Sequence, residues 1–125
     1  MIWTLTQVAL GGAIGALGRF GMVYGAARVL GAGFPWGTLI ANVLGSFAMG
    51  LAFVWLTDRD ALRLAPFVMA GILGGFTTFS AFSLDVLLLY ERGATGMAAL
   101  YVLASVGLSI AALIAGVAAM RGLPG

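Results

Sequence analysis

Four long segments without a charged residue dominate the pattern of hydrophobic and polar positions along this 125-residue chain. The uncharged runs cover residues 1–18, 29–57, 64–84 and 93–120. A helix needs about 20 mostly apolar residues to cross a hydrocarbon layer of about 30 Å, and several of these runs reach that length. The pattern predicts an all-α membrane protein with four transmembrane helices, at about residues 3–27, 36–57, 64–90 and 95–120.

Short polar or glycine-rich segments separate the predicted spans, at residues 31–35, 58–60 and 91–93. Aromatic side chains with one polar end prefer the membrane–water interface. Four of them fall near the predicted span ends: Trp3, Trp36, Trp55 and Tyr90. We therefore predict a single four-span membrane domain over residues 1–125. The first 18 residues lack a basic leader, so we interpret them as the first span rather than a removed signal peptide.

The composition excludes several classes of protein. Hydrophobic residues make up 62% of the chain and charged residues only 8%, whereas soluble domains contain about 25% charged residues. With no cysteine and no histidine, disulfides, thiol catalysis and the usual zinc or haem sites are excluded. The net charge of +2 comes without a basic cluster, so we predict no nucleic-acid partner. An isolated arginine within a span cannot perform acid–base chemistry, and we predict that the protein is not an enzyme.

The arginines give little guidance on orientation in the membrane. With four spans, both termini and the 58–63 loop lie on one side, which carries Arg59, Arg63 and Arg121. The other side carries Arg28 and Arg92, and also Arg19 if it reaches that interface. The positive-inside rule needs a clear excess of basic residues on one side, and there is none. The topology is therefore either weakly specified or dual.

A few polar residues lie inside the predicted spans, each with two interpretations. Arg19 either extends to an interface or provides a fixed positive charge at the mouth of an anion pathway. Asn42 shares a helix face with Thr38, and either bonds to another helix or presents its N–H groups to an anion. Asp85 either pairs with an arginine or belongs to a conduction path.

Residues 74–83 read Gly-Gly-Phe-Thr-Thr-Phe-Ser-Ala-Phe-Ser and are the most informative segment of the chain. Two glycines followed by two threonines weaken a helix, so we predict that the third helix is broken near Gly74–Thr78. Broken helices are tolerated in a bilayer only where protein or a water-filled cavity satisfies the freed backbone, whose carbonyls can coordinate a cation. Phe79 and Phe82, three residues apart, share a face and either pack the bundle or line a pathway.

The fourth span carries hydroxyl groups at helical spacing. Tyr101, Ser105 and Ser109 lie at positions i, i+4 and i+8 of an otherwise apolar segment. A lone serine commonly bonds to its own helix backbone, but three aligned hydroxyls form a polar track.

Three motifs together resemble the bacterial fluoride channels, known as the Fluc or CrcB family. The motifs are Gly-Arg-Phe at 18–20, Gly-Thr-Leu-Ile-Ala-Asn at 37–42 and the ten-residue segment at 74–83. The resemblance covers essentially the whole chain in length, span number and motif order. It implies an antiparallel, dual-topology homodimer in the bacterial inner membrane that exports fluoride passively through two pores along the subunit interface.

The same resemblance implies roles for individual residues. The implied pore residues are Asn42, Phe79, Phe82, Ser80, Thr38, Tyr101, Ser105 and Ser109. Arg19 would lie near the pore entrance, and the backbone carbonyls of Gly74 and Thr77 would hold a central sodium ion. Asp85 is a departure, because family members often have glutamate there, and its role stays open.

Two other functions are compatible with the composition. A small multidrug-type, proton-coupled transporter is also a four-span dimer of about this length, but it needs a membrane-embedded carboxylate in its first span, and this chain has none there. A non-transporting membrane assembly subunit would explain the 20 glycines, which suit close helix packing, but not the interrupted aromatic and hydroxyl segment.

Overall fold

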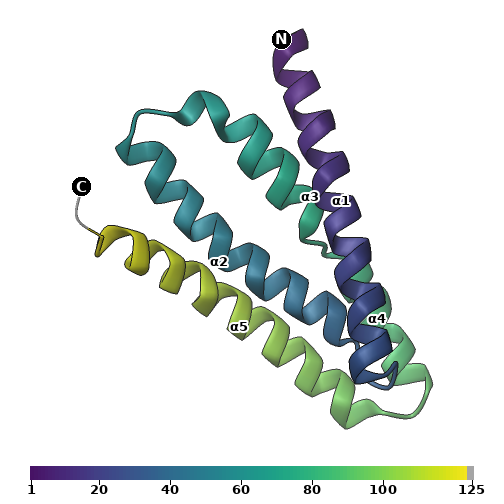
Figure 1. The fold of residues 1–125 in the computed structure, drawn as a ribbon. Coiled ribbons are helices and arrows are strands. Elements are labelled where there is room, and N and C mark those ends of the chain that lie inside the picture. Colours follow the sequence, from purple (N-terminus) through teal and green to yellow (C-terminus); the bar gives the residue numbers. More distant parts are fainter. Residues whose placement is uncertain (124–125) are drawn as a thin grey trace.

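The computed structural model describes residues 1–123 and is helical, with no strand in that part of the chain. Helix α1 covers Ile2–Leu30, α2 covers Trp36–Asp58 and α5 covers Thr95–Arg121 (Figure 1). The third span consists of four pieces: η1 (Leu62–Leu64), η2 (Pro66–Leu73), α3 (Gly74–Phe76) and α4 (Ser80–Glu91). Four stretches are long and apolar enough to cross a membrane, which confirms the four-span prediction.

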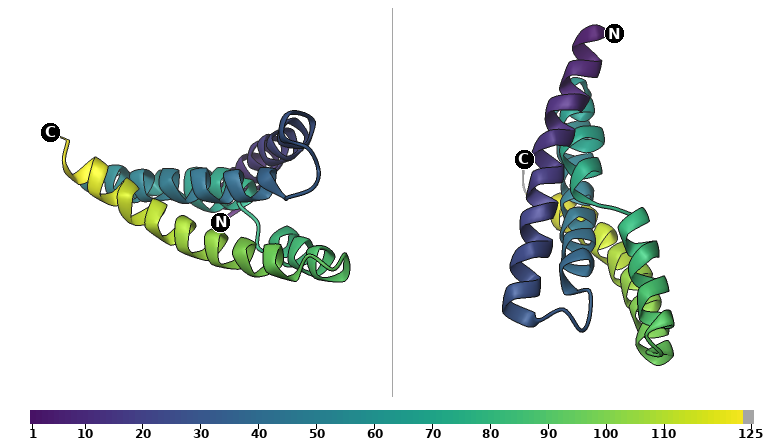
Figure 2. Two further views of the ribbon diagram at one scale, coloured as in Figure 1. Left: turned by 90° about the horizontal axis from the view of Figure 1, so that it is seen from below. Right: turned by 90° about the vertical axis from the view of Figure 1, so that its right-hand side faces the viewer.

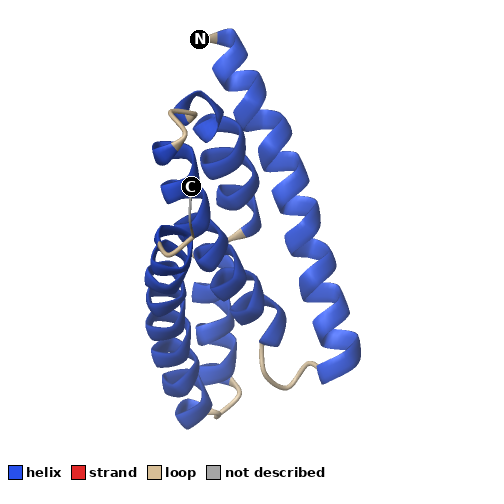
Figure 3. Cartoon of the chain, turned by 60° about the vertical axis from the view of Figure 1, so that its left-hand side comes forward, coloured by secondary structure: helices blue, strands red, loops and turns tan. Residues whose placement is uncertain are grey.

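The four spans pack as two pairs. Helix α2 packs along α5, whereas α1 packs against η2 and α3, and α2 also contacts α1 (Figures 1 and 2). The N-terminus and the loop that follows α2 lie toward one end of the molecule. The loops before α2 and before α5 lie toward the other end (Figure 3). The charged loops therefore gather at the two ends and the apolar helices lie between them.

Small residues allow the helices to approach each other closely, as is typical of membrane bundles. A Cβ atom at Gly15 would overlap the carbonyl oxygen of Ile72 in η2. In the other pair, a Cβ at Gly116 of α5 would overlap the carbonyl oxygen of Phe47 in α2. Backbone contact at these glycines fixes the spacing within both helix pairs.

The third span departs from a regular α-helix twice. Residues Pro66–Leu73 form a wider π-type helix, and the Gly74 N–H still donates to the carbonyl of Met69, five residues earlier. Helical structure then ends at Phe76, Thr77 is extended (φ −90°, ψ 156°), and helix resumes at Ser80. The two glycines therefore lie within the helix, and the non-helical residues are 77–79.

A small apolar core holds α4 in place between α2 and α5. It consists of Leu39, Phe82, Leu89, Ala98 and Tyr101, all buried. The half of the third span that follows the interruption packs mainly against α5, whereas the half that precedes it packs mainly against α1. The interruption lies where these two packing units meet.

Candidate functional site

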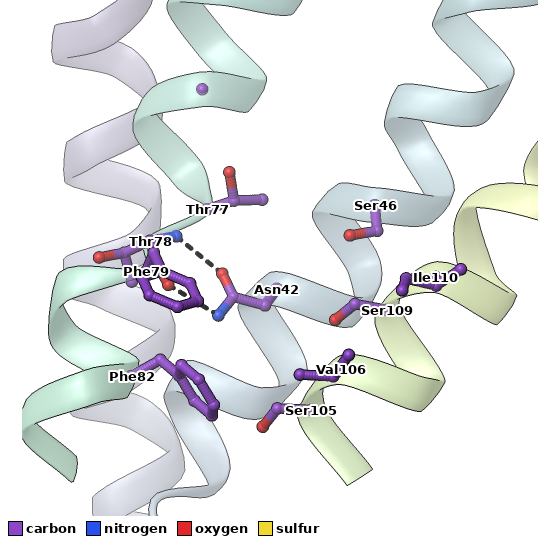
Figure 4. Close-up of a pocket in the computed structure, with 11 residues that line it drawn as sticks. Asn42, Ser46, Thr77, Thr78, Phe79, Phe82, Ser105, Val106, Ser109 and Ile110 are labelled. Carbon is purple, nitrogen blue, oxygen red and sulfur yellow. Dashed lines mark hydrogen bonds between the residues drawn. The ribbon is translucent and has the colours of Figure 1, made fainter. Parts of the chain in front are cut away.

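A cavity of about 430 Å³ lies beside the interruption of the third span, between α2, α4 and α5 (Figure 4). It brings together seven of the residues singled out in the sequence: Asn42, Gly74, Thr77, Phe79, Phe82, Ser105 and Ser109. Four further residues complete the lining: Ser46, Thr78, Val106 and Ile110. No charged side chain is among the lining residues that the structure describes.

Asn42 holds the interruption in place through its side-chain amide. Its Nδ2 donates to the carbonyl of Thr78 at 2.9 Å, and its Oδ1 accepts from the N–H of Thr78 at 2.7 Å (Figure 4). The amide thus bonds to the backbone of a non-helical residue much as a neighbouring peptide group would. The interhelical bond is therefore present, and an amide carries two N–H groups, so one N–H of Asn42 remains.

The Asn42 pairing leaves two carbonyl groups without their helical donors. In a continuous helix the Thr78 N–H would donate to the carbonyl of Gly74, but here it donates to Asn42. In the same way the Ala81 N–H, which would donate to the carbonyl of Thr77, donates to Thr78 Oγ1 at 3.2 Å. Within residues 1–123, no donor replaces these bonds at either carbonyl oxygen. Two strong acceptors at the interruption are thus left without a donor from the described residues.

Arg19 satisfies the carbonyl that lies between these two. Its Nε donates to the Gly75 carbonyl at 3.1 Å, from a half-buried position on α1. A positive charge at the C-terminal end of a helix interacts favourably with the exposed carbonyls and the helix dipole. In this single chain Arg19 binds the helix end at α3 and does not line the cavity.

Aromatic rings form one wall of the cavity. The ring centroids of Phe79 and Phe82 are 5.4 Å apart, and those of Phe82 and Tyr101 are 5.2 Å apart. Phe34 meets the Tyr101 ring edge-on at 5.4 Å. Phe82 is only 7% exposed and fixed by these contacts, whereas Phe79 is 75% exposed in the isolated chain.

The three hydroxyls of α5 have different surroundings. Ser105 is 5% exposed, and its Oγ has no hydrogen-bond partner among the described residues. Ser109 is half-buried and also lines the cavity. Tyr101 is fully buried, lies outside the cavity lining, and donates its hydroxyl hydrogen to Asp85 Oδ2 at 2.9 Å.

Asp85 does not pair with an arginine in the described part of the chain, contrary to one of its two predicted roles. Its partner is Tyr101, which a sequence separation of 16 residues does not suggest. Asp85 and the buried Thr38 border a separate cavity of about 190 Å³ beside the loop that precedes α2.

Ser80 is exposed at the start of α4, 3.5 Å from the Thr78 hydroxyl. Thr38, Ser80, Tyr101 and Arg19 therefore lie outside the main cavity.

Two polar lining residues were missed in the sequence. Thr78 contributes its backbone, which no side-chain pattern reveals. Ser46 lies one helical turn after Asn42, and the i, i+4 spacing of two polar residues in an apolar span is a signal that could have identified it.

Comparison with known proteins identifies close relatives. The family model described as "CrcB-like protein, Camphor Resistance (CrcB)" matches residues 6–117. A protein of Cereibacter sphaeroides (strain ATCC 17029 / ATH 2.4.9), named fluoride-specific ion channel FluC, is 59% identical over 122 residues, which cover 98% of each chain. The proteins of the same name from Ruegeria sp. (strain TM1040) and Paracoccus denitrificans (strain Pd 1222) are 55% and 54% identical. They cover 98% and 96% of each chain, respectively.

The Asn42 pairing predicts a specific effect of substitution at this position. Asn42→Leu leaves the Thr78 N–H and carbonyl unpaired, and an unsatisfied buried polar group costs about 1–3 kcal/mol. We expect a lower unfolding temperature in detergent and faster hydrogen exchange at the Thr78 amide. Ser46→Ala, one turn along α2, is the matched control and should change neither. Unchanged exchange at Thr78 in Asn42→Leu would show that the amide does not hold the interruption.

Proposed function

This chain belongs to the CrcB-like family, and from that premise we propose that it is a fluoride-selective channel that passively exports fluoride across the bacterial inner membrane. The relatives are named as ion channels rather than enzymes, and the four apolar spans make this a multi-pass membrane protein. The role of individual residues in conduction is part of the proposal and is argued below.

The observation that carries the proposal is the unpartnered hydroxyl of Ser105. A buried hydroxyl without a hydrogen bond costs free energy. Such a hydroxyl therefore fits a site where a ligand binds transiently and accepts the hydrogen bond. Ser105 lines the cavity, and its buried Oγ has no partner among the described residues. Fluoride is small and strongly hydrated, and it enters an apolar span only where hydrogen-bond donors replace its water. Ser105 and Ser109 would supply two of them.

The rest of the lining adds weak positive potential without a full charge. Aromatic ring edges are electropositive, and Phe79 and Phe82 lie with their rings together at the cavity. Asn42 has one N–H left after it bonds to Thr78. A pore must bind an ion strongly enough to admit it and weakly enough to release it, and a charge-free donor set meets both requirements.

Fluoride export by such a channel needs no energy source besides the membrane potential. Undissociated hydrogen fluoride crosses lipid and ionises in the less acidic cytoplasm. An inside-negative potential favours exit of the anion, by about 2.3 kcal/mol per charge for each 100 mV. A passive pore is therefore sufficient for protection against fluoride.

We further propose that two copies assemble as a homodimer around the interruption. Non-helical backbone at membrane depth is tolerated only where protein or a water-filled cavity surrounds it. In the single chain Phe79 is 75% exposed and Gly74 is exposed, so lipid would contact both the ring and the unpaired carbonyl. A second copy packed there would cover them. The near-balance of arginines between the two ends favours an antiparallel arrangement.

The unpaired carbonyls of Gly74 and Thr77 fit a sodium ion on the axis of this proposed dimer. Sodium is a hard cation for which carbonyl oxygens are suitable ligands, as discontinuous transporter helices illustrate. Two carbonyls from each copy would give four oxygens around the ion. When bound, the cation would interact with the two carbonyl oxygens whose helical N–H donors bond elsewhere.

Removal of cavity donors tests conduction. Ser105→Ala should slow fluoride efflux from liposomes about tenfold or more, because a hydrogen bond to a charged group contributes about 1.5–3 kcal/mol. Phe82→Leu should also slow it by loss of the ring edge. Ser83→Ala and Phe53→Leu make the same chemical changes outside the cavity and should leave efflux unchanged. The proposed function would be refuted if the wild-type protein did not transport fluoride and instead exported cationic drugs in exchange for protons.

Antiparallel assembly makes a prediction about labelling. A single cysteine placed at Arg121 should react with a membrane-impermeant thiol reagent from both sides of the membrane, in about equal shares. The same cysteine at Arg92, at the opposite end of the spans, should give the same two-sided result. If each cysteine reacted from one side only, and the two cysteines reacted from opposite sides, the chain would have a single orientation.

The sodium site is tested by stability. A ligand that binds only the folded state at about 100 times its dissociation constant adds about 2.7 kcal/mol to the free energy of unfolding. We expect a higher unfolding temperature in sodium than in N-methylglucamine at equal ionic strength. Asn42→Leu removes the pairing that holds the interruption and its carbonyls in place and should abolish this sodium effect, whereas Ser46→Ala should keep it. Equal unfolding temperatures of the wild-type protein in the two salts would exclude the site.

A further inference from the structure

A second cavity, of about 290 Å³, lies near the C-terminal ends of α2 and α5 and does not take part in the proposed conduction path. Apolar residues of three spans line it: Leu51, Trp55 and Leu56 of α2, Leu64 and Val68 of the third span, and Met120 of α5, with two alanines. Its volume is close to the lower end of the range for small-molecule sites, about 300–1,000 Å³. A cavity without polar groups offers water no hydrogen bonds, so its lining fits hydrocarbon.

One part of the cavity lining lies at the ends of the spans, where lipid headgroups meet hydrocarbon. Its lining includes Trp55 and Met120, which fall in the last turns of the α2 and α5 spans, and Leu64 at the start of the third span. Tryptophan near a span end is typical of the interface. A phospholipid whose acyl chain entered this cavity would therefore have its phosphate near the 58–63 loop.

Three of the six arginines lie close in sequence to lining residues, although none of the three is itself in the lining. The guanidinium of Arg59 lies over the ring of Trp55, 5.0 Å from its centroid. Arg63 directly precedes one lining residue in the sequence, and Arg121 directly follows another. Both arginines are exposed. Arginine binds phosphate oxygens in a bidentate manner, and basic clusters next to a membrane span attract anionic lipids.

The local acidic groups do not occupy these arginines. Asp58, the last residue of α2, and Asp60, in the loop that follows, are not among the residues that line the cavity. The arginine hydrogen bonds in the described part of the chain involve Arg19, Arg28 and Arg92, and none involves the three arginines around the cavity. The cationic groups at this end are thus available to a ligand.

We propose that this cavity binds one acyl chain of an anionic membrane phospholipid, whose phosphate is held by Arg63 and Arg121. The apolar lining provides affinity for any acyl chain, and the two guanidinium groups provide the preference for a negative headgroup. The bound lipid fills the space between α2, the start of the third span and α5, where the protein alone leaves a void. This site is independent of fluoride conduction.

Native mass spectrometry of the full chain tests the proposal, after extraction from vesicles of phosphatidylglycerol and phosphatidylcholine with the same acyl chains. The wild-type protein should retain phosphatidylglycerol in preference. The double variant Arg63→Gln, Arg121→Gln should lose this preference, by about fivefold for each guanidinium removed. Arg28→Gln removes a charge at the C-terminal end of α1, at the opposite end of the molecule from the cavity, and should preserve the preference for phosphatidylglycerol.

A second pair of variants separates the acyl-chain cavity from the charges. Ala52→Leu fills the cavity and should reduce retention of both lipids, whereas Ala99→Leu on the exposed face of α5 should not. Equal retention of the two lipids by wild-type protein, or full preference in the double arginine variant, would overturn the proposal. So would a cysteine at Ala52 that forms a disulfide with a second copy, since the cavity would then be covered by protein.

Discussion

Inside a bilayer no water replaces a lost backbone hydrogen bond, so the chain must provide a partner for every peptide group that leaves a helix. The third span meets this requirement through Asn42, which bonds to both the N–H and the carbonyl of Thr78. Because α2 is held along α5 by glycine contacts such as that at Gly116, Asn42 presents its amide from a rigid position. The other features of the site depend on this one side-chain pairing.

The same pairing separates acceptors from donors. It leaves the carbonyls of Gly74 and Thr77 without helical donors, and Arg19 covers the carbonyl between them. The cavity that Gly74 and Thr77 border also has donors and electropositive ring edges in its lining, among them the unpartnered hydroxyl of Ser105. A cation suits the first set of groups and an anion the second. One interruption of one helix can therefore serve both the proposed sodium site and the proposed fluoride path.

The sequence was sufficient for the features that depend on local pattern. Charge-free runs predicted the four spans, and motif residues such as Asn42 and Phe82 are now found together around one cavity. Features that depend on pairing between distant residues were not predictable in this way. The acceptor for Tyr101 is Asp85 on another helix, and Thr78 acts through its backbone, which carries no residue-specific signal. The π-type turns before Gly74, which pack against α1, likewise had no counterpart in the sequence pattern.

The structure also shows that the three aligned hydroxyls of α5 are not equivalent. Tyr101 is buried among aromatic rings, and its hydrogen is directed to Asp85, so it cannot donate the same hydrogen to an anion. Its ring instead packs against Phe82 and fixes the orientation of that ring beside the cavity. The donors left in the cavity then include the serine hydroxyls and an amide N–H, all neutral. Because a neutral set binds an anion less tightly than an arginine would, it favours rapid release, and selectivity must then come from how closely the donors and ring edges surround the ion.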